Sequence, residues 1–97
     1  MPGKSYALHA RVSSDNPDAV APVLERLFGA AAVAPGEALG EFRVEARMTG
    51  AGARELNREV LTELRRAERK TRLRAEWTRD GVTERFFDYV PKGKQKA

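Results

Sequence analysis

The single histidine of this 97-residue chain, His9, is the first residue whose chemistry could serve catalysis. It lies near Ser13 and Ser14, so a Ser-His-carboxylate arrangement can be written. Such triads are defined by geometry, and proximity along one strand does not join a nucleophile to its base. The chain has no cysteine, so it offers no thiolate nucleophile, disulfide or His/Cys zinc site. We therefore interpret His9 as a sheet-face histidine and expect neither catalysis nor a bound metal.

Gly50 and Gly52 lie between an expected strand and an expected helix, where backbone N–H groups can hold a phosphate. A dinucleotide-binding fingerprint would need a third glycine where Glu55 stands, and no P-loop ending occurs. The two glycines are therefore typical of a tight connection, and no cofactor or small-molecule substrate is inferred. Glu55, Glu59 and Glu63 recur at helical spacing, but arginines surround them, which is typical of a solvated helix face.

Aromatic residues near the C-terminus carry the functional prediction. Phe86 and Phe87 are adjacent, so they point to opposite faces of a strand, and Tyr89 shares the face of Phe87. If helices cover the face with Trp77 and Phe86, then Phe87 and Tyr89 expose about 300 Å² or more of apolar surface on the open face. Monomeric proteins seldom leave such a patch without a use. The residues expected beside it are His9, Arg11, Arg43, Arg47, Arg72 and Arg74.

Alternating apolar and polar residues predict half-buried strands over residues 6–13 and 41–48. A helix is expected between them, with Asn16 as its N-cap and Gly29 as its end. A second helix follows the turn at residues 49–52, and both helices show an apolar stripe at helical spacing. The stripes consist of Val20, Val23, Leu24, Leu27 and Phe28 in the first helix and Leu56, Val60, Leu61, Leu64 and Ala67 in the second.

A β-hairpin is expected at Asp80-Gly81, because a type I′ turn needs positive φ at both central residues. This turn places Glu76 opposite Arg85, a favourable cross-strand charge pair. The second strand is expected to run without a break to Val90. The core face of the hairpin then carries Leu73, Ala75, Trp77, Val82, Glu84, Phe86, Asp88 and Val90.

The resulting order of strand, helix, strand, helix, strand, strand predicts an α+β two-layer sandwich with both helices on one face of a mixed sheet. Residues 30–40 can form a loop, or can include a short strand at residues 31–34. In the second case the plan becomes ferredoxin-like with one extra C-terminal strand. We expect a single domain over residues 1–91 and a basic, flexible tail at residues 92–97.

The simpler element order is similar to that of the Alba chromatin proteins and of the C-terminal domain of translation initiation factor three, both of which bind nucleic acid. The resemblance is one of topology and covers no motif. Alba-like chains carry a paired lysine in the turn after the first strand, where this chain has residues 13–16, Ser-Ser-Asp-Asn. It therefore implies a fold more than a function.

The composition is that of a soluble globular protein, with 41% hydrophobic residues, 33% charged residues and a net charge of +4. The N-terminal residues show no apolar signal-peptide region, and no run approaches the about 18 apolar residues that a membrane span needs. With no cysteine to place it in an oxidising compartment, we expect a cytoplasmic protein.

Three interpretations of the open face compete. The first is a homodimer through this face, favoured because Glu41 and Glu45 alternate with Arg43 and Arg47. The alternative is binding of single-stranded nucleic acid, RNA or DNA, with bases stacked on the aromatic rings and phosphates on the arginines. In the third, the loop at residues 30–40 or the tail covers the aromatic residues, or strand twist moves them to the edge of the core.

Overall fold

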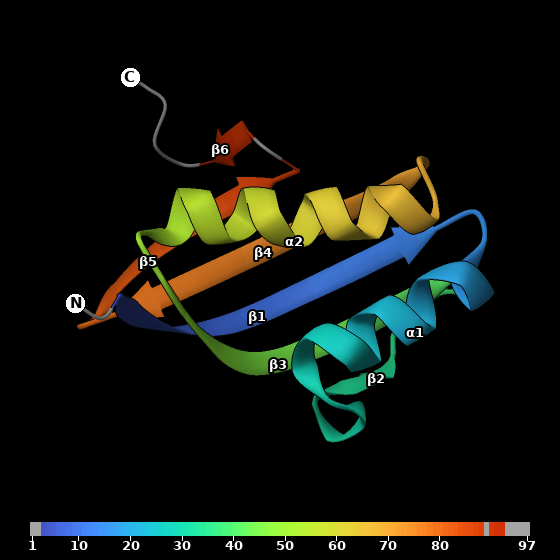
Figure 1. Cartoon of the computed structure of the whole chain (residues 1–97), viewed down its shortest axis with the longest axis horizontal. Helices are drawn as coiled ribbons and strands as arrows, with labels where there is room; N and C mark the ends of the chain where they lie inside the picture. The colour runs from blue at the N-terminus through green and yellow to red at the C-terminus, as the bar shows by residue number, and fades with distance from the viewer. Residues whose placement is uncertain (1–2, 89, 93–97) are drawn as a thin grey trace.

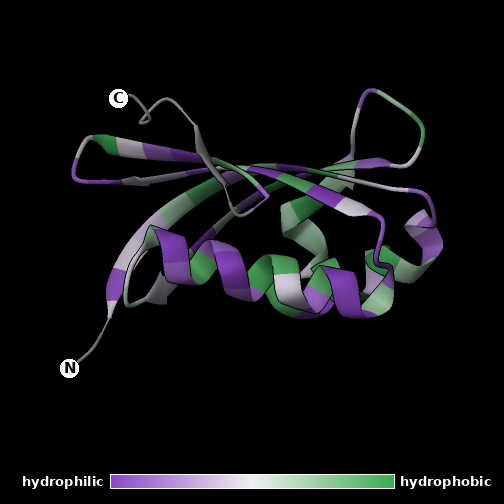
Figure 2. Ribbon diagram, turned by 90° about the horizontal axis from the view of Figure 1, so that it is seen from above, coloured by the Kyte–Doolittle hydropathy of each residue, from purple (hydrophilic) through white to green (hydrophobic). Residues whose placement is uncertain are grey.

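In the part of the chain that the computed structural model describes, six strands form one sheet, and two helices cover one of its faces (Figure 1). Seen from above, both helices lie on the same side of the sheet (Figure 2). We call the opposite face, which no described helix covers, the open face. The structure describes residues 3–88 and 90–92. The expected two-layer α+β sandwich is confirmed.

The strands follow the order β2-β3-β1-β4-β5-β6 across the sheet. The elements along the chain are β1 (Lys4–Ser14), α1 (Pro17–Phe28), the 3-10 helix η1 (Ala30–Ala32), β2 (Val33–Pro35), β3 (Glu41–Gly50), α2 (Ala53–Ala67), β4 (Thr71–Arg79), β5 (Val82–Phe87) and β6 (Val90–Lys92). No helix within this described part of the chain is long and apolar enough to cross a membrane.

The elements β1 to β4, with α1 and α2, form the ferredoxin-like arrangement, in which each helix links two strands that run the same way. A third strand lies between the members of each such pair: β3 between β1 and β2, and β1 between β3 and β4. All strand pairings are therefore antiparallel, and the expected mixed sheet is wrong.

The short strand in the region of residues 30–40 exists, but it begins at Val33 because the preceding residues Ala30–Ala32 form the 3-10 helix. The hairpin at Asp80 and Gly81 is confirmed, with φ angles of 54° and 78°. Glu76 and Arg85 pair across it as expected.

The expectation of one strand running through to Val90 is wrong. β5 ends at Phe87, Asp88 takes a φ of 60°, and the chain reverses so that β6 returns beside β5 with Val90 opposite Phe87. The ferredoxin-like core therefore gains two C-terminal strands instead of one. Lys92, assigned from the sequence to the tail, is the last residue of β6, and residues 93–97 lie outside the described part of the chain.

Trp77 lies at the centre of the core, fully buried, with its ring at 88° to that of Tyr6 and 6.4 Å from it. The apolar stripes of both helices pack on this face of the sheet, with Val20 and Leu24 of α1 buried. The expected stripe of α2 needs two corrections. Ala67 is exposed in the last turn of the helix, and Asn57, a polar residue, occupies a buried position on the stripe.

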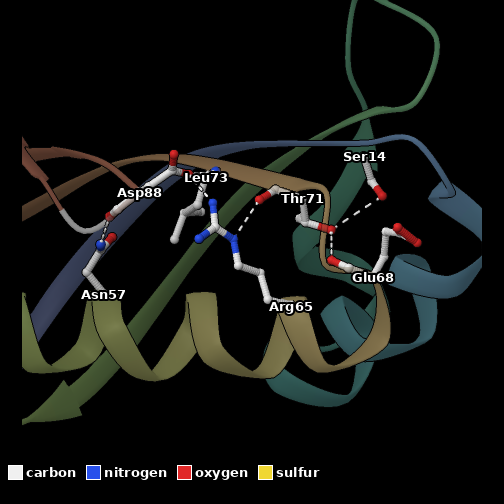
Figure 3. A network of polar contacts seen from close by, with 7 residues as sticks. All are labelled: Ser14, Asn57, Arg65, Glu68, Thr71, Leu73 and Asp88. Atoms are coloured by element: carbon white, nitrogen blue, oxygen red, sulfur yellow. Dashed lines mark hydrogen bonds and ion pairs between the residues drawn. The ribbon is translucent and has the colours of Figure 1, made fainter.

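A polar network fixes the chain reversal at Asp88 against α2 and β4 (Figure 3). The Asp88 carboxylate accepts the N–H of Leu73 at 2.9 Å and lies 3.5 Å from Arg65 Nη2, while the Asp88 N–H donates to the Leu73 carbonyl. Asn57 donates its amide to the Asp88 carbonyl and accepts the indole N–H of Trp77 at 3.2 Å. The network connects the buried core to the turn that follows Phe87.

Candidate functional site

The open face of the sheet is covered by charged side chains. Arg11, Arg43, Arg72 and Arg74 are all exposed there, as expected, and the Phe87 side chain is 42% exposed. Tyr89, the sixth residue predicted for this face, lies outside the described residues. The alternation of side chains along the strands was therefore sufficient to assign five of the six residues to a face.

Three arginines stand directly opposite one another on three neighbouring strands: Arg43 on β3, Arg11 on β1 and Arg74 on β4. We call these residues the arginine row. Like charges in directly opposed positions destabilise a sheet. Among the described residues, neither Arg11 nor Arg43 has an ion-pair partner. The fold therefore leaves the charges of Arg11 and Arg43 without an ion pair within the described part of the chain.

The arginine row ends at Phe87, which pairs with Arg74 across β4 and β5. The guanidinium carbon of Arg74 lies 4.9 Å from the centre of the Phe87 ring, within the range of a cation–π contact. This contact covers part of the ring, so the apolar surface of Phe87 is smaller than the sequence suggested. The face is distinguished by its charge more than by an apolar patch.

A second row lies two residues further along the strands. Glu45, His9 and Glu76 oppose one another on β3, β1 and β4, and we call these residues the acidic row. The row continues to Arg85 on β5, whose Nε donates to Glu76 Oε2 at 3.1 Å. His9 Nδ1 lies 3.9 Å from Glu45 Oε2. Successive residues on one face are about 7 Å apart along a strand, so the two rows lie side by side.

A depression of about 370 Å³ lies over both rows. Its lining includes all members of the arginine row and of the acidic row, together with Arg85 and Phe87. Because these side chains are exposed, the depression is a surface that a partner can enter and not an enclosed substrate cavity. The chain between α1 and β3 does not cover it at Phe87, because β2 and β5 lie toward opposite ends of the sheet.

The other sequence candidates have structural explanations. The hydroxyl of Ser14 accepts the N–H of Asn16 at 3.1 Å, so it is engaged away from His9. A Cβ atom at Gly50 would lie 2.5 Å from a methyl carbon of the buried Leu56. A Cβ atom at Gly52 would lie 2.9 Å from the Glu55 carboxylate. Close packing thus requires Gly50, whereas a Cβ atom at Gly52 would meet only the end of the flexible, exposed Glu55 side chain. The Glu55 carboxylate lies where a bound phosphate would meet it.

Among the described residues, no group of three or more His, Asp or Glu side chains is placed to hold a metal ion. Comparison with protein-family models, with curated proteins and with solved structures finds no match for this chain. The geometry of the open face is therefore the feature from which a function is inferred.

The rows themselves were missed by the sequence analysis, although their members were assigned to the correct face. Alternation along one strand says which residues share a face, but it does not say which residues of two distant strands stand opposite each other. The sequence did predict one cross-strand pair, Glu76 with Arg85, because the short hairpin turn at Asp80 and Gly81 fixes the register of the two strands it joins. The pairing of Arg11 with both Arg43 and Arg74 depends on contacts between distant parts of the chain.

Proposed function

We propose that this protein acts through protein contacts, without catalysis, as a homodimer that joins two copies of the open face. The observation that carries the proposal is the arrangement of the arginine row directly beside the acidic row. Two adjacent rows of opposite charge are self-complementary. A two-fold axis between them places the arginine row of one copy over the acidic row of the second copy, and the acidic row of the first over the arginine row of the second. A two-fold interface of this kind uses the same patch on both subunits.

The axis would lie between the two sheets, parallel to the rows and midway between them. Each strand would then lie over the same strand of the second copy. Arg43 therefore meets Glu45 of the partner subunit, and Arg74 meets Glu76 of the partner subunit. Arg11 would meet His9 of the partner subunit, and Phe87 would meet Arg85 of the partner subunit in a further cation–π contact. Every contact occurs twice, once on each side of the axis.

The energetics of such a face favour specificity over tight binding. Partly solvated ion pairs contribute about 0.2–1 kcal/mol each, and water remains between many of the charged groups. Complementary charges nevertheless fix the register of two surfaces and exclude others. Arginine is also the charged residue that is enriched at protein interfaces. We therefore expect a dimer with a dissociation constant of about micromolar order.

Sedimentation equilibrium between about 1 and 100 μM tests the proposal, a range chosen around that micromolar estimate. The wild-type chain is expected to change from monomer to dimer across this range. Arg74→Glu is expected to remain monomeric, because each of its two contacts across the interface would join like charges. A wild-type chain that is monomeric throughout, or a variant that dimerises as well as wild type, would contradict the proposal.

Single-stranded nucleic acid is the alternative partner, and one observation favours it. The arginine row runs across three strands into Phe87, with Arg72 on the same face, so phosphates could meet the arginines while a base stacks on the ring. Neutralising about three or four phosphates predicts that the logarithm of the binding constant falls with the logarithm of salt, with a slope of roughly −2 to −3. Fluorescence anisotropy with labelled mixed-sequence RNA and DNA at about 50 and 200 mM salt measures this slope. The acidic row beside the arginines opposes this alternative.

A further inference from the structure

The outer edge of β3 offers a second surface, separate from the open face. β3 has ten residues, but β2 pairs with only three of them, Phe42, Arg43 and Val44. On this edge no described strand pairs with residues 45–50, and Figure 1 shows β2 beside only part of β3. Unpaired backbone N–H and C=O groups on a sheet edge form a template for an added strand.

The hydrophobic core is less completely closed along this side than elsewhere. Trp77 and Phe86, toward the other end of the sheet, are buried at 0% and 3% exposure. The partly buried apolar residues around the core all lie on α1, β2 and β3: Val23, Leu27, Phe28, Val33, Phe42, Ala46 and Met48. A strand added at residues 45–50 would therefore extend the sheet where the core is still partly exposed.

A groove between α1 and α2 lies on the same side of the molecule. It has a volume of about 380 Å³, and its lining includes Leu27, Met48 and Val60. Met48 belongs both to this groove and to the unpaired part of β3. Alternate side chains of an added strand would point toward the helices, where apolar groups would contact Met48 and Ala46.

The charges near the edge indicate the other side chains of the added strand. Arg47 is exposed on the open-face side of β3, and within residues 3–88 and 90–92 its one polar contact is a 3.4 Å hydrogen bond to the Ser5 hydroxyl. Arg58 lines the groove and has no ion-pair partner among the described residues. Glu59 and Glu63 also line the groove, and Glu45, on the same side of β3 as Arg47, lies 3.9 Å from His9 Nδ1. Arg47 is therefore the unpaired charge on this side of the described residues 45–50, and an acidic residue between the apolar ones would meet it.

We propose that residues 45–50 of β3 bind an extended segment of a partner protein, in which apolar residues alternate with acidic residues. The segment would add a strand to the sheet, with main-chain hydrogen bonds along β3 and its apolar side chains against Met48 and the groove. Its acidic side chains would pair with Arg47. Nothing in this proposal requires the homodimer, since it uses an edge and not the face.

A second copy of this chain fits the same edge less well. Antiparallel pairing of two β3 edges centred on Arg47 would place the two Arg47 side chains opposite each other. Pairing centred on Ala46 would place Glu45 opposite Arg47, but it would leave only residues 45–47 before β2 of each copy is reached, because Val44 is already paired. Pairing centred on Met48 places no acidic residue opposite Arg47. The short free edge in one register and the charges in the other two thus favour a different, acidic chain.

The test uses the full chain labelled with nitrogen-15 and a capped seven-residue peptide in which valine alternates with glutamate. Peptide binding is expected to shift the backbone amide signals of residues 45–50 and of Leu27. A peptide of the same composition with its valines grouped together is expected to bind at least about tenfold more weakly, because it cannot place apolar and acidic side chains on opposite faces. A peptide with lysine in place of glutamate is expected to bind more weakly as well.

The variant Arg47→Glu tests the role of the Arg47 charge in peptide binding. Its matched control is Arg69→Glu, which changes the same residue type at an exposed position beyond α2. The first is expected to weaken binding of the glutamate peptide at least about tenfold and to favour the lysine peptide, whereas the control binds as wild type does. Far-UV circular dichroism checks that both variants are folded. The proposal is overturned if millimolar peptide leaves the signals of residues 45–50 unchanged, or if Arg47→Glu has no effect. It is also overturned if the signals of residues 46–50 shift with protein concentration alone in Arg74→Glu, the variant expected not to dimerise through the open face, since a second copy would then fill the edge.

Discussion

Replacement of Asn57 by alanine is expected to lower the free energy of unfolding by about 2–4 kcal/mol. Asn57 is 1% exposed and Trp77 is fully buried, so the indole N–H that bonds to Asn57 would be left without a partner inside the core. The wild-type side chain also donates to the backbone carbonyl of the partly buried Asp88. Each buried polar group left without a hydrogen bond costs about 1–3 kcal/mol.

Thermal and urea unfolding measure this loss, and for a domain of this size it corresponds to a fall in melting temperature of roughly 10–25 °C. Glu59→Ala, at an exposed position on the same helix, is the control and is expected to stay within about 0.5 kcal/mol of wild type. Hydrogen exchange should accelerate most at the Asp88 amide, which bonds to the Leu73 carbonyl beside the lost contact. A loss below about 1 kcal/mol would show that the network contributes little to stability.

Asn57 carries a signal that was present in the sequence but was left out of the predicted stripe of α2. It follows Leu56 and precedes Val60 and Leu61, so it lies on the apolar stripe of α2 at helical spacing. A polar residue on such a stripe signals a buried hydrogen bond, since an unpaired one would be too costly. The partners could not be identified from the sequence, because Trp77 on β4 and Asp88 in the turn after β5 meet α2 only in the folded chain.

The local features of the fold were predictable because each depends on a few neighbouring residues. The hairpin at Asp80 and Gly81 and the helix that begins at Pro17 are examples. The reversal after Phe87 was missed, although Asp88 is one of the residues that tolerates positive φ and Pro91 is unfavourable within a continuous central strand. The alternation of apolar residues continued past Asp88 to Val90, and the strand prediction followed this alternation despite Asp88 and Pro91.

The open face was predictable as a set of residues but not as a pattern of charge. Alternation assigned Arg11, Arg43 and Arg74 to one face, and the structure confirms this. Their alignment into one row, beside Glu45 and Glu76, depends on the register of β1 against β3 and β4. Since strand register over long sequence separations is set by the whole core, the complementarity of the two rows became visible only in the structure.

That complementarity makes the exchange of Arg74 and Glu76 the most decisive test of the homodimer. Arg74→Glu and Glu76→Arg should each weaken dimerisation by about 2–4 kcal/mol, because two attractive contacts are replaced by two repulsive ones. This corresponds to a dissociation constant raised roughly 30- to 1000-fold. The double variant should dimerise within about tenfold of wild type, since opposite charges again face each other across the axis.

Sedimentation equilibrium of the four proteins gives the coupling energy between the two positions. Exchanging Glu63 and Arg66, an ion pair on α2, is the matched control and should leave dimerisation unchanged. Nucleic-acid binding would behave differently, because the double variant keeps its net charge but breaks the arginine row and so would not recover binding. Recovery of the dimer in the double variant would therefore support the paired rows. Two single variants that each dissociate without recovery in the double variant would show that Arg74 and Glu76 act separately, and the proposed axis would be wrong.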